Sequence, residues 1–340
     1  MSLSSFSEDT IHTLTPDTTL ILDTLLLDQK IILKADKPLN IFDERLRILD
    51  ENSPMDLAYN EKVHPFIESY IGRNKALISR MQGLKNLYFP LFEQQLDKYN
   101  LPLEFKYLAI VESAMNPKAK SHSGATGLWQ FMYLTGKQYG LNVTSYMDER
   151  QDPYKATEAA CVYFEKLYDT FGDWNLVLAA YNGGPGYLQK KINTVGSNDF
   201  WVLYPHLRRE TRNYIPTFIA VNYAMNYAEE HGISPQTTKI EVGITDTLTL
   251  KKQIELKVLA EMICVNEETI LYLNPAYKKN IFPKESVVVL PEFAAIDFKF
   301  NEETNYAFIE SVDNKEILID EERIVYRVHK GDYLGRIAKD

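Results

Sequence analysis

The chain has 340 residues, 45% of them hydrophobic and 12% aromatic, so it can bury a sizeable core and a second, smaller one. Its formal net charge is −10, and a near-neutral middle lies between two acidic flanks. This balance indicates no basic face that could collect phosphates, which argues against nucleic acid as a partner and favours an uncharged or mildly charged polymer.

The first sixty residues mix short apolar runs with turn formers such as Lys37-Pro38 and give no pattern of a stable unit. We interpret residues 1–60 as an N-terminal extension of unknown role. Its apolar stretch at residues 20–33 is interrupted by charges and is too short and too polar for a membrane span or an export signal.

Residues 61–232 have a helical pattern almost throughout. Asp152 followed by Pro153 is typical of a helix start, and Asp173 can cap the next helix. A last long helix is expected over residues 208–231. This part of the chain therefore predicts an all-α domain.

The pattern changes after this domain. Residues 240–244 and 286–290 are expected to form strands, and two short helices are expected between them, at residues 258–263 and 267–273. The order strand, helix, helix, strand predicts a small α+β domain at residues 239–292.

One helix, expected between residues 102 and 117, carries an acid on its apolar side. Phe105, Leu108 and Ala109 form its buried stripe, and Glu112 continues that stripe in the last turn. Burial and the negative end of the helix dipole both disfavour the carboxylate and raise the pKa, as a general acid near neutrality requires. The alternative is a structural Glu paired with a basic residue, or an exposed one.

Four segments, in a fixed order along the chain, favour the catalytic interpretation of Glu112 over the structural one. They read Glu-Ser-Ala-Met-Asn-Pro at 112–117, Ser-His-Ser-Gly-Ala-Thr-Gly-Leu-Trp-Gln-Phe-Met at 121–132, Ala-Tyr-Asn-Gly-Gly-Pro-Gly at 180–186 and Glu-Thr-Arg-Asn-Tyr at 210–214. Together they resemble the motifs of family 1 lytic transglycosylases, the soluble-lytic-transglycosylase and goose-lysozyme-like group. The arrangement is most similar to the membrane-bound lytic murein transglycosylase D branch, in which LysM repeats follow the catalytic domain.

The resemblance implies a mainly α protein, with a lysozyme-like helical catalytic domain followed by a small α+β LysM-like domain. It also implies cleavage of the β-1,4 bond between N-acetylmuramic acid and N-acetylglucosamine without water. Glu112 would act first as acid and then as base, and the muramoyl end would close into a 1,6-anhydro ring. A goose-type lysozyme on the same fold and a non-catalytic peptidoglycan-binding protein remain as alternatives.

The resemblance further implies a set of substrate-binding residues around Glu112, namely Ser121, Gln130, Tyr181, Asn182, Glu210 and Tyr214. The first two match positions that line the cleft, and the next two match a pair that contacts sugar and orients the acid. The last two match a helix that faces Glu112, where Glu210 would be a supporting partner. For Gln130 and Asn182, ordinary turn or surface polarity is the alternative.

Near the end of the chain, residues 326–340 resemble the first strand and helix of a LysM repeat, truncated before its second half. The Leu-Tyr-Leu-Asn-Pro segment at 271–275 also resembles LysM, so residues 239–292 are interpreted as a divergent copy that either binds sugar or packs on the catalytic domain. Residues 293–325 are expected to be a linker.

The histidines show no metal-ligand spacing and no Cys-x-x-Cys occurs, so we expect no metal and no cofactor. By the resemblance, the expected partner is the glycan strand of peptidoglycan, and the expected location is the periplasm or cell envelope. An export signal, and any membrane attachment, would then belong to an N-terminal segment absent from this sequence.

Overall fold

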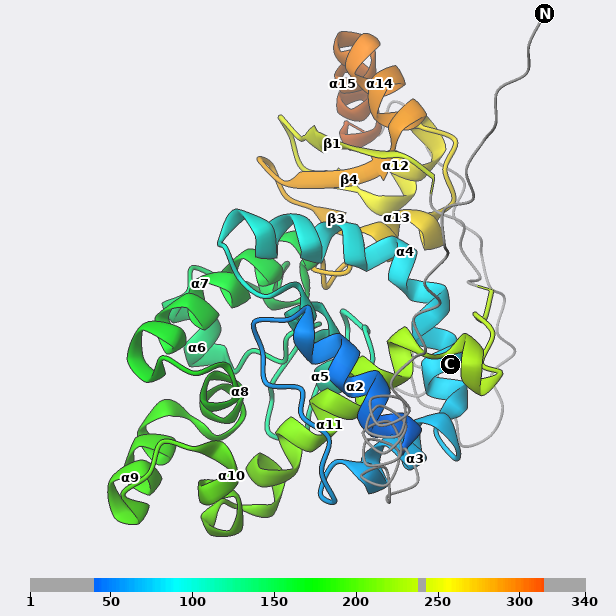
Figure 1. Cartoon of the computed structure of the whole chain (residues 1–340). Coiled ribbons are helices and arrows are strands. Elements are labelled where there is room, and N and C mark those ends of the chain that lie inside the picture. The colour runs from blue at the N-terminus through cyan, green and yellow to red at the C-terminus, as the bar shows by residue number, and fades with distance from the viewer. Residues whose placement is uncertain (1–39, 238–242, 315–340) are drawn as a thin grey trace, which may run out of the picture.

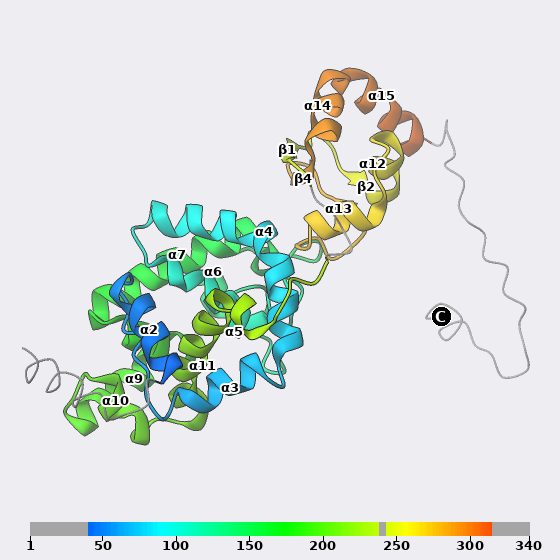
Figure 2. The same cartoon turned by 45° about the vertical axis from the view of Figure 1, so that its right-hand side comes forward.

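The computed structural model describes residues 40–237 and 243–314, which form two domains that contact each other (Figures 1 and 2). The larger domain is helical, and the smaller one combines short strands with helices. The predicted class, a mainly α protein with a small α+β domain at its C-terminal side, is confirmed. The truncated LysM repeat expected at 326–340 lies outside the described residues, as do residues 1–39 of the expected extension.

The larger domain is built almost entirely from α-helices and short 3-10 turns. In chain order these are α2 (Ile41–Glu51), α3 (His64–Ile71), α4 (Lys75–Lys98), η1 (Leu103–Tyr107), α5 (Leu108–Ser113), α6 (Tyr133–Gln138), η2 (Glu149–Gln151), α7 (Pro153–Phe171), α8 (Trp174–Gly183), α9 (Pro185–Val195), α10 (Phe200–Leu203), η3 (Tyr204–His206), α11 (Arg209–Asn226) and η4 (Glu229–His231). Within the described residues, no helix is both long enough and apolar enough to cross a membrane.

Local sequence signals set several of these helix ends. The carboxylate of Asp152 accepts hydrogen bonds from the backbone N–H groups of Tyr154 and Lys155, at 2.9 and 3.0 Å, so α7 begins where its N-cap predicts. Asp173 caps α8 in the same way. The last long helix is shorter than expected, because α11 ends at Asn226 and only a 3-10 turn continues toward His231.

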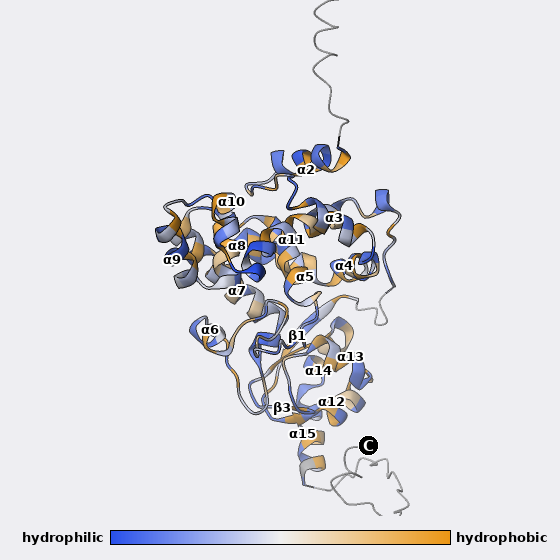
Figure 3. Cartoon of the chain, turned by 90° about the horizontal axis from the view of Figure 1, so that it is seen from below, coloured by the Kyte–Doolittle hydropathy of each residue, from blue (hydrophilic) through white to orange (hydrophobic). Residues whose placement is uncertain are grey.

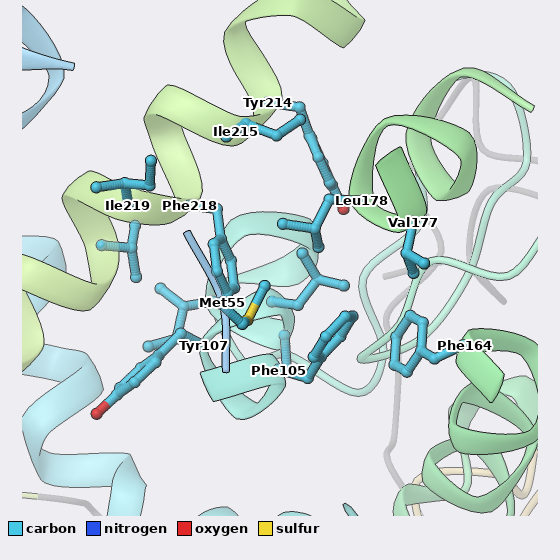
Figure 4. Close-up of a cluster of buried hydrophobic side chains, with 14 of the residues drawn as sticks. Met55, Phe105, Tyr107, Phe164, Val177, Leu178, Tyr214, Ile215, Phe218 and Ile219 are labelled. Carbon is cyan, nitrogen blue, oxygen red and sulfur yellow. The ribbon is translucent and has the colours of Figure 1, made fainter. Parts of the chain in front are cut away.

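An aromatic core holds the larger domain together and fixes the position of η1 and α5. Phe105 lies at its centre, with its ring 4.5 Å from that of Phe164 on α7 and 6.4 Å from that of Phe218 on α11 (Figure 4). Large buried rings of this kind contribute much of the apolar burial that stabilises a fold. Figure 3 shows hydrophobic colouring on α5 and α8, in the middle of this domain, and hydrophilic colouring on α6 at its edge.

Part of the expected N-terminal extension belongs to this core. Leu46 of α2 is fully buried, Met55 and Leu57 are almost so, and Met55 lies among the side chains of Figure 4. The guanidinium of Arg45 also donates to the hydroxyl of Tyr223 at 2.9 Å. The boundary placed at residue 60 is therefore wrong for residues 40–60. Leu46 is the only buried residue of α2, so the helix shows too narrow an apolar stripe to reveal its packing.

The smaller domain contains β1 (Thr245–Thr249), β2 (Ile254–Glu255), α12 (Leu256–Met262), α13 (Glu267–Leu273), β3 (Ile281–Phe282), β4 (Val287–Pro291), α14 (Glu292–Phe300) and α15 (Glu302–Asp313). β1 pairs antiparallel with β4, with Thr245 opposite Pro291 and Thr249 opposite Val287. The predicted order of strand, helix, helix, strand is present. The first strand begins at Thr245, where its partner ends, and not at residue 240; residues 240–242 lie outside the described part.

The linker expected at 293–325 is wrong for the residues that form α14 and α15. Phe298 and Tyr306 are buried against each other in a T-shaped contact with centroids 5.7 Å apart. The hydroxyl of Tyr306 also accepts a hydrogen bond of 2.7 Å from the backbone N–H of Lys251. These helices complete the core of the smaller domain, because they cover apolar surface that the two short sheets leave open.

Candidate active site

Glu112 lies in the last turn of α5, on the apolar stripe that the sequence predicts. Phe105, Leu108 and Ala109 are fully buried, and the Glu112 side chain, which continues their stripe, is half-buried. The helix then ends in two residues with left-handed backbone angles, Ala114 with φ of 51° and the following residue with φ of 53°. This turn releases the chain directly after the acid, as the proline at 117 indicates.

The hydroxyl of Tyr214, on α11, donates a hydrogen bond to Oε1 of Glu112. Burial raises the pKa of Glu112 to about 7, the bond from Tyr214 lowers it, and the nearby charge of Glu210 raises it. Burial, together with the charge of Glu112, raises the pKa of Tyr214 well above its ordinary value, so this residue stays a neutral donor. The site therefore holds a carboxyl group poised to change its protonation state near neutral pH.

The 119–131 loop lies beside the end of α5. The hydroxyl of Ser113, the residue after Glu112, donates to the carbonyl of Leu128 at 2.9 Å. Isolated backbone bridges join Thr126 to Lys120 on one side and to Phe131 on the other. The loop thus runs back on itself next to the acid, and it carries the two residues expected to line a cleft.

Those two residues, Ser121 and Gln130, both contribute to the turns of the loop. The hydroxyl of Ser121 accepts from the N–H of Ala125 at 3.0 Å, and the amide of Gln130 donates to the carbonyl of Gly127 at 2.8 Å. Gln130 also has a positive φ of 49°. The turn-forming alternative for Gln130 therefore has structural support, and both side chains remain half-buried and partly open.

Tyr181 links helix α8 to the same loop. Its hydroxyl donates to the carbonyl of Trp129 at 2.6 Å, and its ring lies 5.0 Å from that of Phe164. Trp129 is fully buried, and its indole N–H donates to the hydroxyl of Thr157 at 2.9 Å. The sequence gives no signal for Thr157, because its role depends on a partner 28 residues away.

Asn182 follows Tyr181 and presents a buried side-chain oxygen with no hydrogen-bond partner within the described residues. The hydroxyl of Thr211, one turn before Tyr214 on α11, is in the same state. A Cβ on Gly183 would lie 3.0 Å from that hydroxyl, so the glycine allows α8 and α11 to approach closely at this point. Unpaired buried polar atoms are costly in a folded protein unless a ligand or water satisfies them.

Glu210 is exposed in the first turn of α11, and its charge reaches Glu112, although no hydrogen bond joins the two. Within the described residues, no group of three or more His, Cys, Asp or Glu side chains could hold a metal ion. The absence of a cofactor stays a prediction.

These features define a helical domain with one half-buried acid, held by a tyrosine and flanked by a polar loop. Residues 90–204 match the transglycosylase SLT domain, and residues 244–307 match the LysM-like domain of lytic transglycosylase MltD. The chain therefore carries an SLT transglycosylase domain followed by the MltD type of LysM-like domain, and the resemblance drawn from the motifs is confirmed.

The chain is 29% identical over 299 residues to the membrane-bound lytic murein transglycosylase D of Escherichia coli K12, covering 84% of this chain and 64% of that protein. It thus spans less than two thirds of that relative. It is 30% identical over 148 residues to the soluble lytic murein transglycosylase of the same strain, covering 41% of this chain and 23% of the relative. The crystal structure of the 70 kDa soluble lytic transglycosylase of Escherichia coli superposes with a TM-score of 0.37 at 22% identity, covering 52% of this chain and 33% of that structure.

Proposed function

We propose that this protein is a peptidoglycan lytic transglycosylase in which Glu112 is the only acid/base catalyst. The observation that carries the proposal is the state of Glu112, a half-buried carboxyl group that receives a hydrogen bond from Tyr214 and has a pKa raised to about 7. Such a group is protonated often enough near neutral pH to donate a proton, and basic enough afterwards to take one back.

The reaction follows from that cycle. Glu112 donates its proton to the oxygen of the β-1,4 bond, the bond from that oxygen to C1 of N-acetylmuramic acid breaks, and N-acetylglucosamine leaves with a free hydroxyl. The muramoyl C6 hydroxyl then attacks C1 and returns its proton to Glu112, which closes the 1,6-anhydro ring. Atoms balance without water, and the enzyme ends in its starting state.

A second carboxylate is unnecessary when the N-acetyl group of the sugar stabilises the cationic centre at C1. The geometry supports one acid, because Glu210, the acidic side chain whose charge acts on Glu112, is exposed and makes no hydrogen bond to it. We therefore assign Glu210 an electrostatic effect on the acid and no nucleophilic role.

The polar groups around Glu112 suit an acetamide-bearing sugar. Asn182 is half-buried next to Tyr181, and Ser121 and Gln130 lie on the neighbouring loop, so amide and hydroxyl groups of the kind that sugar hydroxyls and acetamides bind are present here. Tyr181 and Tyr214 already use their hydroxyls within the protein, so we infer that they position the loop and the acid.

We further propose that the substrate is the glycan strand of peptidoglycan and that the protein works in the periplasm or cell envelope. The names of the relatives, which are murein transglycosylases, support the substrate.

The test is to incubate the purified protein with peptidoglycan and to record mass spectra of the soluble products. Glu112→Gln is compared with Glu165→Gln, which changes an exposed acid on α7. Products lighter by one water than hydrolysis products, absent only with Glu112→Gln, are the expected result. Full-mass reducing ends would identify a goose-type lysozyme instead, and binding without release by the unaltered protein would leave a non-catalytic binding protein.

A further inference from the structure

A buried ion pair lies at the junction of the two domains. The guanidinium of Arg150 meets the carboxylate of Asp148 through two hydrogen bonds of 2.9 and 2.8 Å, and both side chains are less than one tenth exposed. A two-pronged pair of this kind has a fixed geometry, and removing one buried partner is strongly destabilising. The pair therefore fixes the orientation of the Arg150 guanidinium and so the position of its remaining hydrogen bonds.

The free arm of Arg150 reaches the 119–131 loop. Its Nη1 donates to the carbonyl of Gly124 at 3.1 Å and to the carbonyl of Phe131 at 3.2 Å. The backbones also meet directly, since a Cβ on Gly127 would lie 1.7 Å from the carbonyl oxygen of Arg150. Arg150 thus holds the loop that carries Ser121 and Gln130 at two points, Gly124 and Phe131.

The opposite side of the ion pair is held by the LysM-like domain. The backbone N–H of Asp148 donates to the carbonyl of Ala276 at 2.8 Å, and the N–H of Lys278 donates to the carbonyl of Tyr146 at 2.8 Å. The ammonium of Lys278 donates to the carbonyl of Thr144 at 2.7 Å. The residues before the ion pair therefore form a short antiparallel contact with residues 276–278.

Side chains strengthen that contact. Met147 packs against the core of the LysM-like domain, and its backbone is bridged to that of Tyr277. Burial alone would raise the pKa of Asp148, but the hydrogen bonds and charge of Arg150, with a contribution from Lys278, hold it below its ordinary value. A charge of the second domain thus favours the ionised form of the carboxylate that orients Arg150.

We propose that Arg150 is a positioning residue through which the LysM-like domain holds the 119–131 loop in its substrate-binding geometry. The path runs from residues 276–278 to Asp148, from Asp148 to Arg150, and from Arg150 to the carbonyls of Gly124 and Phe131. The inference rests on the proposed function for the role of the loop, but the mechanical link itself does not. It assigns the LysM-like domain a part in the active site that needs no sugar contact of its own.

The link is tested first without turnover, in the full chain, by amide hydrogen exchange. Arg150→Lys keeps a positive charge but loses the planar arms, and Lys278→Met removes the ammonium bond across the domain junction. Lys284→Met, which changes an exposed lysine of the same domain, is the matched control. The amides of Thr126 and Phe131, which pair with each other, are expected to exchange faster in the first two variants, while amides within α8 stay protected.

Kinetics on a soluble tetrasaccharide of alternating N-acetylglucosamine and N-acetylmuramic acid give the second readout. Arg150→Lys is expected to raise KM by on the order of tenfold or more with a smaller change in kcat, since misplacing binding groups by about 1 Å can cost 100-fold. Lys278→Met is expected to raise KM less. Partial unfolding would instead lower kcat through the active fraction and leave KM unchanged.

The double variant, with Arg150→Lys and Lys278→Met together, tests whether the LysM-like domain acts on the loop through Arg150. If the second domain acts through Arg150, Lys278→Met adds little to loop exchange or KM in the Arg150→Lys background. Multiplicative effects, or faster loop exchange in Arg150→Lys alone, would overturn the proposed coupling between domain and loop. Absence of turnover by the unaltered protein would instead overturn the proposed function, while the exchange data would still decide the mechanical link.

Discussion

The end of α5 and the 119–131 loop lie side by side, yet different contacts hold them. Phe105 and Leu108 fix α5 by packing, with both side chains fully buried in the core. The loop is packed too, through the buried side chains of Leu128, Trp129 and Phe131, but its carbonyl groups also accept hydrogen bonds from Ser113, from Tyr181 and from Arg150. Hydrogen bonds weaken steeply when their angles are distorted, so the shape of the loop depends on these donors in addition to its packing. Changes around the acid should therefore alter chemistry and pH dependence, and changes around the loop should alter substrate binding.

The largest expected effect is on the chemical side. Glu112→Gln keeps the shape of the side chain and removes the proton cycle, so kcat is expected to fall by roughly 100-fold to 10,000-fold. Release of soluble products from peptidoglycan measures it. Binding to the same peptidoglycan should survive, since the 119–131 loop is unchanged. A Glu112→Gln variant with more than a tenth of the original turnover would contradict the assignment.

The same variant has a second, catalysis-independent signature. The pKa of Glu112 is raised from 4.5 to about 7 in the folded state, so the folded protein binds more protons between these values than the unfolded chain does. The contribution of Glu112 to the free energy of unfolding, measured against the Glu112→Gln variant, is therefore fully present below pH 4.5 and is lost as the pH rises to about 7. By linkage the loss approaches about 3 kcal/mol, reduced by partial exposure. Urea denaturation at pH 4.5 and pH 8 measures it, and an equal difference at both would argue against a raised pKa.

On the loop side, Tyr181→Phe removes the hydroxyl bond to the carbonyl of Trp129 and leaves a buried acceptor unpaired. The expected cost is about 1–3 kcal/mol of unfolding free energy. KM should rise while the pH profile of kcat stays unchanged. Tyr163→Phe is the control, because its ring lies 5.4 Å from that of Tyr181 and its hydroxyl makes no hydrogen bond within the described residues. Equal effects of both changes would mean that packing, and not the hydroxyl, matters.

The two regions also differ in how far the sequence predicts them. Glu112 could be placed because its spacing from Phe105 and Leu108 is a local helical period, and Tyr214 because it closes a recognisable motif. Asp148 and Arg150 could not, since two charges two residues apart are usually solvated, and the further acceptors of Arg150 are backbone carbonyls more than fifteen residues away. Every residue has a backbone carbonyl, so the residue types of a loop do not indicate which carbonyls accept hydrogen bonds from a distant side chain.

The same reasoning explains the errors in the domain limits. Met55 and Leu57 belong to the core of the larger domain through contacts with residues far along the chain, and their own segment has no regular period. Phe298 and Tyr306 lie in helices whose N-terminal caps make no side-chain hydrogen bond. Asn301 followed by Glu302 and Glu303 is nevertheless a helix-start signal, which the interpretation of residues 293–325 as a linker missed. Burial against distant residues decides the case of Met55 and Leu57, and a local pattern does not contain that information.

The smallest expected effects concern the pKa of Glu112. Two changes should move the pH dependence of kcat/KM in opposite directions. Tyr214→Phe removes the hydrogen bond that lowers the pKa of Glu112, so the loss of kcat/KM at high pH should move to higher pH. Glu210→Gln removes a negative charge that raises this pKa, so the same limb should move to lower pH. That second shift is expected to stay under about one pH unit, since Glu210 is exposed and water and salt screen its charge. Profiles of kcat/KM against pH at two salt concentrations test both changes. The Glu210→Gln shift should shrink as salt rises, and the Tyr214→Phe shift should not, because a direct hydrogen bond to a half-buried carboxyl is not screened.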